Sequence, residues 1–117
     1  MKMRHVTIST SRFEEEIEFY KEVVKLCVAR EMHGPGRDIV FLANGEGETQ
    51  VEIIKSDGAS CAGTEFISMG FETENVEKKR EELLGKGFEV SEIRDVGGGT
   101  KFFHVKDPAG VRVQFIN

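Results

Sequence analysis

Residues 100–116 read TKFFHVKDPAGVRVQFI, and residues 38–55 read DIVFLANGEGETQVEIIK. Each stretch holds two segments that are apolar or alternate between apolar and polar residues, with a short turn rich in Gly, Asn or Asp between them. Alternation with a period of two indicates strands, and these turn residues predict a β-hairpin in each stretch. The expected strands cover 38–43 and 49–55 in the first half and 100–106 and 111–116 in the second.

The same succession of elements precedes each hairpin. The sequence predicts a strand, a helix and a further strand in each half, over 3–9, 12–26 and 27–32 and then over 65–73, 75–84 and 88–94. Ser11, followed three residues later by Glu14, matches a capping box at the start of the first helix. A strand–helix–strand–hairpin order therefore occurs twice.

The spacing between the halves supports an internal duplication. His5 precedes Ser68 by 63 residues, and Glu52 precedes Gln114 by 62, so one extra residue in the first turn explains the difference. We therefore predict an α+β fold of two βαβββ modules with curved mixed sheets, helices on the convex side and a cavity on the concave side. The domain is expected to be single, over 1–117, with modules at about 1–55 and 64–117 and a linker at 56–63. Chance resemblance of two short, generic α+β halves is the alternative.

Composition narrows the range of function classes. The chain has 117 residues and a net charge of −5. It has no basic stripe, so a nucleic-acid partner is not expected. Its apolar runs are too short for a membrane span, and its N-terminus carries no apolar signal segment. Cys27 and Cys61 have no CxxC spacing, which favours free thiols and a cytoplasmic location.

Strand alternation assigns four polar residues to one side of the predicted sheets. If Val51 and Ile53 face the helix, Glu52 faces away from it, and the same reasoning places His5, Ser68 and Gln114 on helix-free faces. These four positions correspond to one another in the duplication. We therefore expect them to meet at one small-molecule site.

The chain resembles the vicinal oxygen chelate superfamily, which comprises glyoxalases, bleomycin-resistance proteins and dioxygenases. The segments that carry this resemblance are 4–8, 19–21, 51–54, 98–103 and 107–114, and together they extend over most of the chain. Within the superfamily, the chain is most similar to bacterial glyoxalase I (lactoylglutathione lyase). The resemblance implies a homodimer in which a half-site of one chain faces the other half-site of its partner.

The glyoxalase I pattern implies a metal site of two histidines and two glutamates. His5 and Glu52 match the first two positions, whereas Ser68 and Gln114 replace the expected histidine and glutamate. The resemblance thus implies a weakened site for Zn²⁺, Ni²⁺ or Mn²⁺, held by His5, Glu52 and weakly by Gln114. Glu52 would also have to move the proton during catalysis.

Aromatic residues complete the predicted pocket. Phe66 shares the face of Ser68, and a tight turn at 107–110 would place Phe103 opposite Gln114 and turn His104 toward the helix. A shift of one residue in the pairing would exchange Phe103 and His104. Such aromatic groups in an acidic protein suggest a planar or cationic ligand.

Three hypotheses for the function follow. The first is a lyase similar to lactoylglutathione lyase, acting on a hemithioacetal or a related small carbonyl. The second is a metal-free protein of the bleomycin-resistance type, which binds or sequesters a small molecule. The third is a dimerising module whose cavity no longer has a function.

Overall fold

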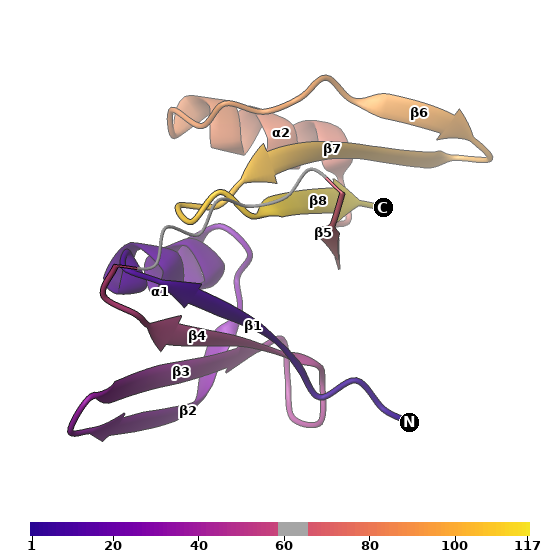
Figure 1. Cartoon of the computed structure of the whole chain (residues 1–117). Coiled ribbons are helices and arrows are strands. Elements are labelled where there is room, and N and C mark those ends of the chain that lie inside the picture. Colours follow the sequence, from indigo (N-terminus) through magenta and orange to yellow (C-terminus); the bar gives the residue numbers. More distant parts are fainter. Residues whose placement is uncertain (59–65) are drawn as a thin grey trace. The chain divides into compact units, whose positions relative to one another are not determined.

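The computed structural model describes residues 1–58 and 66–117, in two compact units, Met1–Cys61 (unit 1) and Ala62–Asn117 (unit 2). Unit 1 contains β1 (His5–Thr10), α1 (Phe13–Glu22), β2 (Cys27–Gly34), β3 (Arg37–Ala43) and β4 (Gln50–Lys55). Unit 2 contains β5 (Ser68–Glu72), α2 (Val76–Gly85), β6 (Arg94–Gly97), β7 (Thr100–Lys106) and β8 (Arg112–Ile116). Each unit is thus a βαβββ module (Figure 1).

Both units have the same sheet topology. The strand order is β1-β4-β3-β2 in unit 1 and β5-β8-β7-β6 in unit 2. The first and last strands of each module pair in parallel, and the other pairs are antiparallel, so each sheet is mixed. These observations confirm the predicted α+β fold class and its two modules.

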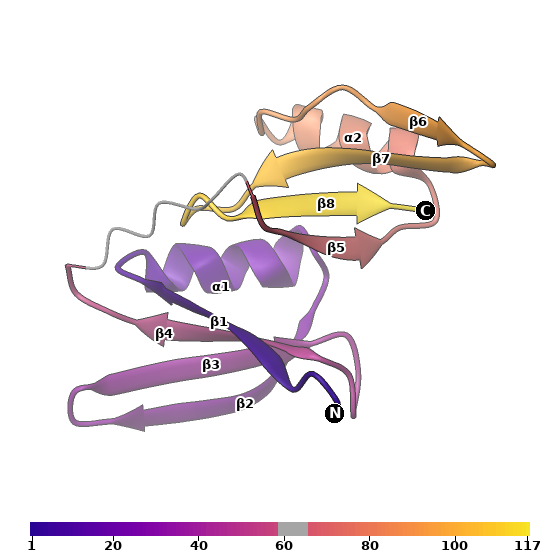
Figure 2. The ribbon, with the colours of Figure 1, turned by 45° about the vertical axis from the view of Figure 1, so that its right-hand side comes forward.

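One helix packs on one face of each sheet. In unit 1, α1 contacts β3 and β4, where Val40, Leu42, Val51 and Ile53 alternate with residues of the opposite face (Figure 2). In unit 2, α2 contacts β7 and β8. We call the opposite side of each sheet its helix-free face, because it carries the residues between these core positions.

The first helix differs from the prediction at both ends. Its N-cap is Arg12 and no side chain caps it, so the predicted capping box of Ser11 and Glu14 is wrong; Thr10 Oγ1 instead accepts a hydrogen bond from the Arg12 amide at 3.0 Å. The helix ends at Glu22 rather than at residue 26. Lys25, with φ at 67°, takes a left-handed conformation that an α-helix cannot continue through.

The second helix begins as predicted. Asn75 is its N-cap, and the Asn75 side chain accepts a hydrogen bond from the Lys78 amide at 2.9 Å. This bond satisfies one of the amide groups that the first turn of a helix leaves without a backbone partner.

The strand predicted over 88–94 is shorter and later than expected. It forms at Arg94–Gly97, and before it only Val90 makes an isolated bridge, to Val105. The Ser91 hydroxyl accepts a hydrogen bond from the His104 amide at 2.8 Å, while the Ser91 amide donates to the His104 carbonyl at 2.9 Å. The Ser91 hydroxyl thus accepts the hydrogen bond that a backbone carbonyl of a paired strand would otherwise accept from the His104 amide.

The pairing of β7 with β8 corrects the prediction for Phe103 and His104. His104 pairs with Gln114, and Phe103 pairs with Phe115, one residue away from the predicted pairing. The turn is longer than expected because the Asp107 side chain accepts from the Val111 amide at 2.8 Å and Gly110 takes a φ of 86°. Phe103 is therefore fully buried on the helix side, in contact with Phe115.

Two further expectations concern the connection between the modules and the membrane. Residues 59–63 of the predicted linker, and Cys61 with them, lie outside the described residues, while Cys27 is an exposed free thiol. Within 1–58 and 66–117, no helix is long and apolar enough to cross a membrane.

Candidate functional site

The helix-free face of unit 1 brings His5 and Glu52 into contact. β1 and β4 run parallel, with Thr7 opposite Glu52. His5 lies two residues before Thr7 on β1, so its side chain is on the same face as that of Glu52. His5 Nε2 lies 3.2 Å from Glu52 Oε2. The Glu52 side chain is 12% exposed and that of His5 is 42% exposed, so the carboxylate is held largely within the sheet and the imidazole reaches solvent.

An aromatic ring and a cation complete this face. Phe41 on β3 pairs with Glu52 on β4. The ring centroid of Phe41 lies 5.9 Å from that of His5 in an edge-on arrangement. The Arg30 guanidinium stacks over the Phe41 ring at 4.4 Å from its centroid. His5 and Glu52 thus contact each other and lie beside the ring of Phe41, over which the Arg30 guanidinium is stacked.

The helix-free face of unit 2 carries a hollow of about 510 Å³. Its lining comes from β5, β6, β7 and β8 and from the segments before β5 and β6. The lining residues are Phe66, Ser68, Ser91, Glu92, Arg94, Phe102, His104, Arg112 and Gln114. This volume lies within the range of small-molecule pockets, roughly 300–1,000 Å³.

The Gln114 side chain lies beside a residue that has no side chain of its own. Gly70 is the partner of Gln114 on β5, and a Cβ atom at Gly70 would lie 3.2 Å from Gln114 Oε1. Glycine at this position therefore leaves room for the amide group of Gln114, which lines the hollow.

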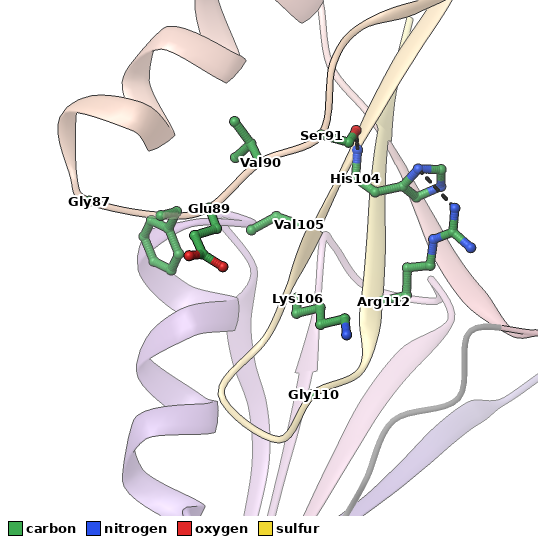
Figure 3. A pocket seen from close by; sticks show the side chains of 10 residues that line it. Gly87, Glu89, Val90, Ser91, His104, Val105, Lys106, Gly110 and Arg112 are labelled. Atoms are coloured by element: carbon green, nitrogen blue, oxygen red, sulfur yellow. Dashed lines mark hydrogen bonds between the residues drawn. The ribbon is translucent and has the colours of Figure 1, made fainter.

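His104 joins the hollow to a neighbouring one. A second hollow, of about 650 Å³, shares Ser91, His104 and Arg112 with the first and extends along 87–90 toward Gly110 (Figure 3). Arg112 Nη2 lies 3.3 Å from His104 Nδ1. Burial lowers the pKa of His104 from its ordinary value of 6.5, and the positive charges of Arg112 and Arg94 lower it further.

The predicted site residues fall into two groups. His5 and Glu52 meet in unit 1, while Phe66, Ser68 and Gln114 line one hollow in unit 2. Phe103 lies in the core instead, so its predicted place in the pocket is wrong. Convergence of His5, Glu52, Ser68 and Gln114 on one site stays a prediction.

Six lining residues of the hollow were not among the predicted site residues: Ser91, Glu92, Arg94, Phe102, His104 and Arg112. The preferred pairing turned His104 toward the helix, and the structure has the alternative pairing, shifted by one residue. Arg94 was expected at the end of a strand and is instead the first residue of β6. Arg112 was recoverable, because it alternates with Gln114 on β8 and so had to share the helix-free face.

A comparison with protein families identifies the chain. The model described as "Glyoxalase/Bleomycin resistance protein/Dioxygenase superfamily" matches residues 2–115. The chain belongs to this superfamily. No curated protein matches the sequence.

Solved structures of the superfamily share the fold. A glyoxalase family protein from Enterococcus faecalis is 25% identical, with a TM-score of 0.79 over 99% of this chain and 97% of its own. A trypanothione-dependent glyoxalase I from Leishmania major is 22% identical, with a TM-score of 0.85 over 100% of this chain and 86% of its own. A glyoxalase I mutant from Zea mays is 24% identical, with a TM-score of 0.85 over 98% of this chain but 44% of its own.

The residues present in each unit do not fit the divalent metal that the resemblance to glyoxalase I implies. Within 1–58 and 66–117, no three or more His, Cys, Asp or Glu side chains are grouped so that they could hold a metal ion. Among the described residues of unit 1, the predicted site has two donors, His5 and Glu52, and they are bound to each other. In unit 2 the weak donors Ser68 and Gln114 share their hollow with two guanidinium groups, whose charge opposes a cation.

Proposed function

We propose that this superfamily member binds a small organic molecule on the helix-free face of unit 2 and needs no metal ion to do so. The observation that carries the proposal is the hollow of about 510 Å³. It combines two aromatic side chains with several polar groups from different strands, the usual composition of a small-molecule site. Phe66 is 97% exposed, so its ring is accessible to a ligand.

The donor chemistry supports binding without a metal. A divalent ion is held most strongly by imidazole, thiolate and carboxylate groups, whereas hydroxyl and amide oxygens are weaker ligands. Ser68 and Gln114 offer only the weaker kind, and both can hydrogen-bond directly to an organic ligand. This is the behaviour that the bleomycin-resistance hypothesis requires.

A fragment screen tests this proposal. Protein treated with EDTA is mixed with a set of small aromatic fragments, and binding is followed by ligand-observed NMR and by amide shifts of the protein. We expect fragments that move the amide signals of His104 and Gln114 and lose binding in Ser68→Tyr, which fills the hollow. Ser11→Tyr, on an exposed bend outside the hollow, is the matched control and keeps binding.

Two results would overturn the proposal. One is the absence of any fragment whose binding Ser68→Tyr removes. The other is binding that appears only when Zn²⁺, Ni²⁺ or Mn²⁺ is added to the metal-free protein.

A second candidate is isomerisation of a hemithioacetal, as in lactoylglutathione lyase. The contact of His5 with Glu52 favours it, because Glu52 is a carboxylate next to a partly exposed imidazole and so could move a proton. The hemithioacetal of methylglyoxal and glutathione is the substrate to assay, with and without each metal. Activity that Glu52→Gln removes would support this candidate. If no condition gives activity, the lyase candidate is wrong and ligand binding is the one proposed function that is left.

We further propose that the protein forms a homodimer, which the resemblance implies. Every residue of β2 is exposed, and β2 is an edge strand with open backbone groups, which supports association through this edge. Light scattering coupled to size exclusion measures the mass in solution. A mass of about 26 kDa, twice the chain mass of 13.1 kDa, is expected, and a monomer mass contradicts the proposal.

A further inference from the structure

The charged side chains that line the unit 2 hollow are mostly cationic, although the protein is acidic. The net charge of the chain is −5, yet Arg94 and Arg112 both line the hollow, and Lys106 lies beside Arg112 on the same face. Glu92, the one carboxylate in its lining, is 94% exposed and pairs with Arg80 at 3.3 Å. The hollow is therefore a region of positive charge on a negative molecule.

The two arginines are held in different ways. Arg112 is half-buried and donates a hydrogen bond to His104. The Arg94 side chain has no ion-pair partner within 1–58 and 66–117. An arginine presents a planar set of donors that fits the two oxygens of a carboxylate or the oxygens of a phosphate. Arg94 is thus available to bind an oxyanion.

Aromatic groups lie beside these cations. Phe102 pairs with Arg94 across β6 and β7, so their side chains share the helix-free face. Phe66 lines the same hollow from the segment before β5. A ligand that reaches both kinds of group needs a flat apolar part and an oxyanion.

From this arrangement we infer that the ligand is a small planar organic anion, whose carboxylate or phosphate binds Arg94 and Arg112 while its flat part packs on Phe66 and Phe102. This inference rests on the proposed binding function and names its ligand class. It keeps the planar ligand that the sequence suggested and proposes an anion in place of the cationic alternative, because the charge of the hollow has the opposite sign from that of the whole chain.

Matched probes test the ligand class. Benzoate, phenyl phosphate and benzamide share one ring and differ in charge, and their dissociation constants are measured by amide shift titration of the full chain. We expect both anions to bind at least tenfold more tightly than benzamide, because hydrogen bonds to charged groups are the stronger ones. Preference between benzoate and phenyl phosphate then tells which oxyanion the hollow takes. Affinity of the anions should fall as NaCl is raised.

Variants tie the effect to the two arginines. Arg94→Met, on the exposed edge strand β6, and Arg112→Met should each weaken benzoate binding about tenfold and leave benzamide unchanged. Arg37→Met, which removes the same charge from unit 1, is the control and should leave both unchanged. Since Arg94 has no ion pair within the described residues, its variant tests the inference even if Arg112→Met fails to fold.

The outcomes separate this inference from the proposed function. If benzamide moves the amide signals of the hollow as strongly as benzoate does, the hollow binds small molecules but the anion class is wrong. If Arg37→Met weakens benzoate as much as Arg94→Met does, the effect is one of net charge, and the inference is also wrong. If none of the probes and none of the screened fragments moves these signals, the proposed function itself fails.

Discussion

Arg112 donates a hydrogen bond from Nη2 to Nδ1 of His104 over 3.3 Å, between the neighbouring strands β8 and β7. A guanidinium group can only donate, so Nδ1 of His104 must carry a lone pair. The imidazole is therefore neutral and holds its proton on Nε2. Protonation of His104 would break this bond and bring a third positive charge into the hollow.

His104 should titrate below the ordinary histidine value of 6.5. Burial is the larger cause of its lowered pKa, and the charges of Arg112 and Arg94 add to it. Two-dimensional NMR of the imidazole signals measures the midpoint, which Arg112→Met should raise toward 6.5. A midpoint at or above 6.5 in the parent protein would contradict the neutral imidazole.

The lowered pKa has a consequence for stability. Below pH 6.5 the unfolded chain binds a proton at His104 more readily than the folded chain does. The free energy of unfolding from this group therefore falls as the pH drops through 6.5 toward the folded pKa. Urea unfolding at several pH values should show a smaller loss in His104→Gln, which cannot be protonated.

His33 should titrate on the other side of 6.5. Its Nδ1 lies 2.8 Å from Asp38 Oδ1, and this hydrogen bond is the main cause of its raised pKa, with a further contribution from Glu31. The stabilisation is complete below 6.5 and is lost as the pH rises through the folded pKa. NMR titration of Asp38→Asn should bring the midpoint of His33 back toward 6.5 and leave that of His104 in place.

The fold was predictable because one face of each sheet is buried. Burial of one face favours alternation, which assigned Val51, Ile53 and Glu52 to their faces. The hairpins were located by their turn residues, because the residues of β3 from Ile39 to Ala43 are all apolar and all buried. The ends of α1 were not predictable in this way, since they depend on the backbone of Lys25 and on a bond to Thr10. Neither leaves a pattern in the sequence.

The candidate site was predictable only where it depended on alternation. Ser68 and Gln114 lie on the expected face, because their strands obey the period of two. Phe103 and His104 exchanged places because the turn, in which the Asp107 side chain accepts a hydrogen bond from the Val111 amide, is longer by one residue than expected. A pairing error of one residue turns every side chain of a strand over, so one hydrogen bond altered the predicted lining of the pocket.

Adjacent leucines of α2 should differ sharply in their contribution to stability. Leu83 is fully buried, while Leu84 is 47% exposed. Leu83→Ala should cost about 2–5 kcal/mol of the free energy of unfolding, through lost burial and a cavity. Leu84→Ala should cost less than about 1 kcal/mol, and urea unfolding of both variants compares them. Equal losses would mean that α2 presents a different face to its sheet.

Loss of a polar residue before the first turn should destabilise α2 but not α1. Asn75 caps α2 through its bond with the Lys78 amide, so Asn75→Ala should cost about 1 kcal/mol of the free energy of unfolding. Ser11 makes no cap bond to α1, so Ser11→Ala should stay within about 0.5 kcal/mol of the parent. Urea unfolding measures both, and Asn75→Asp serves as the control because aspartate caps a helix as well as asparagine does. A loss of 1 kcal/mol in Ser11→Ala would restore the capping box that the sequence predicted for α1.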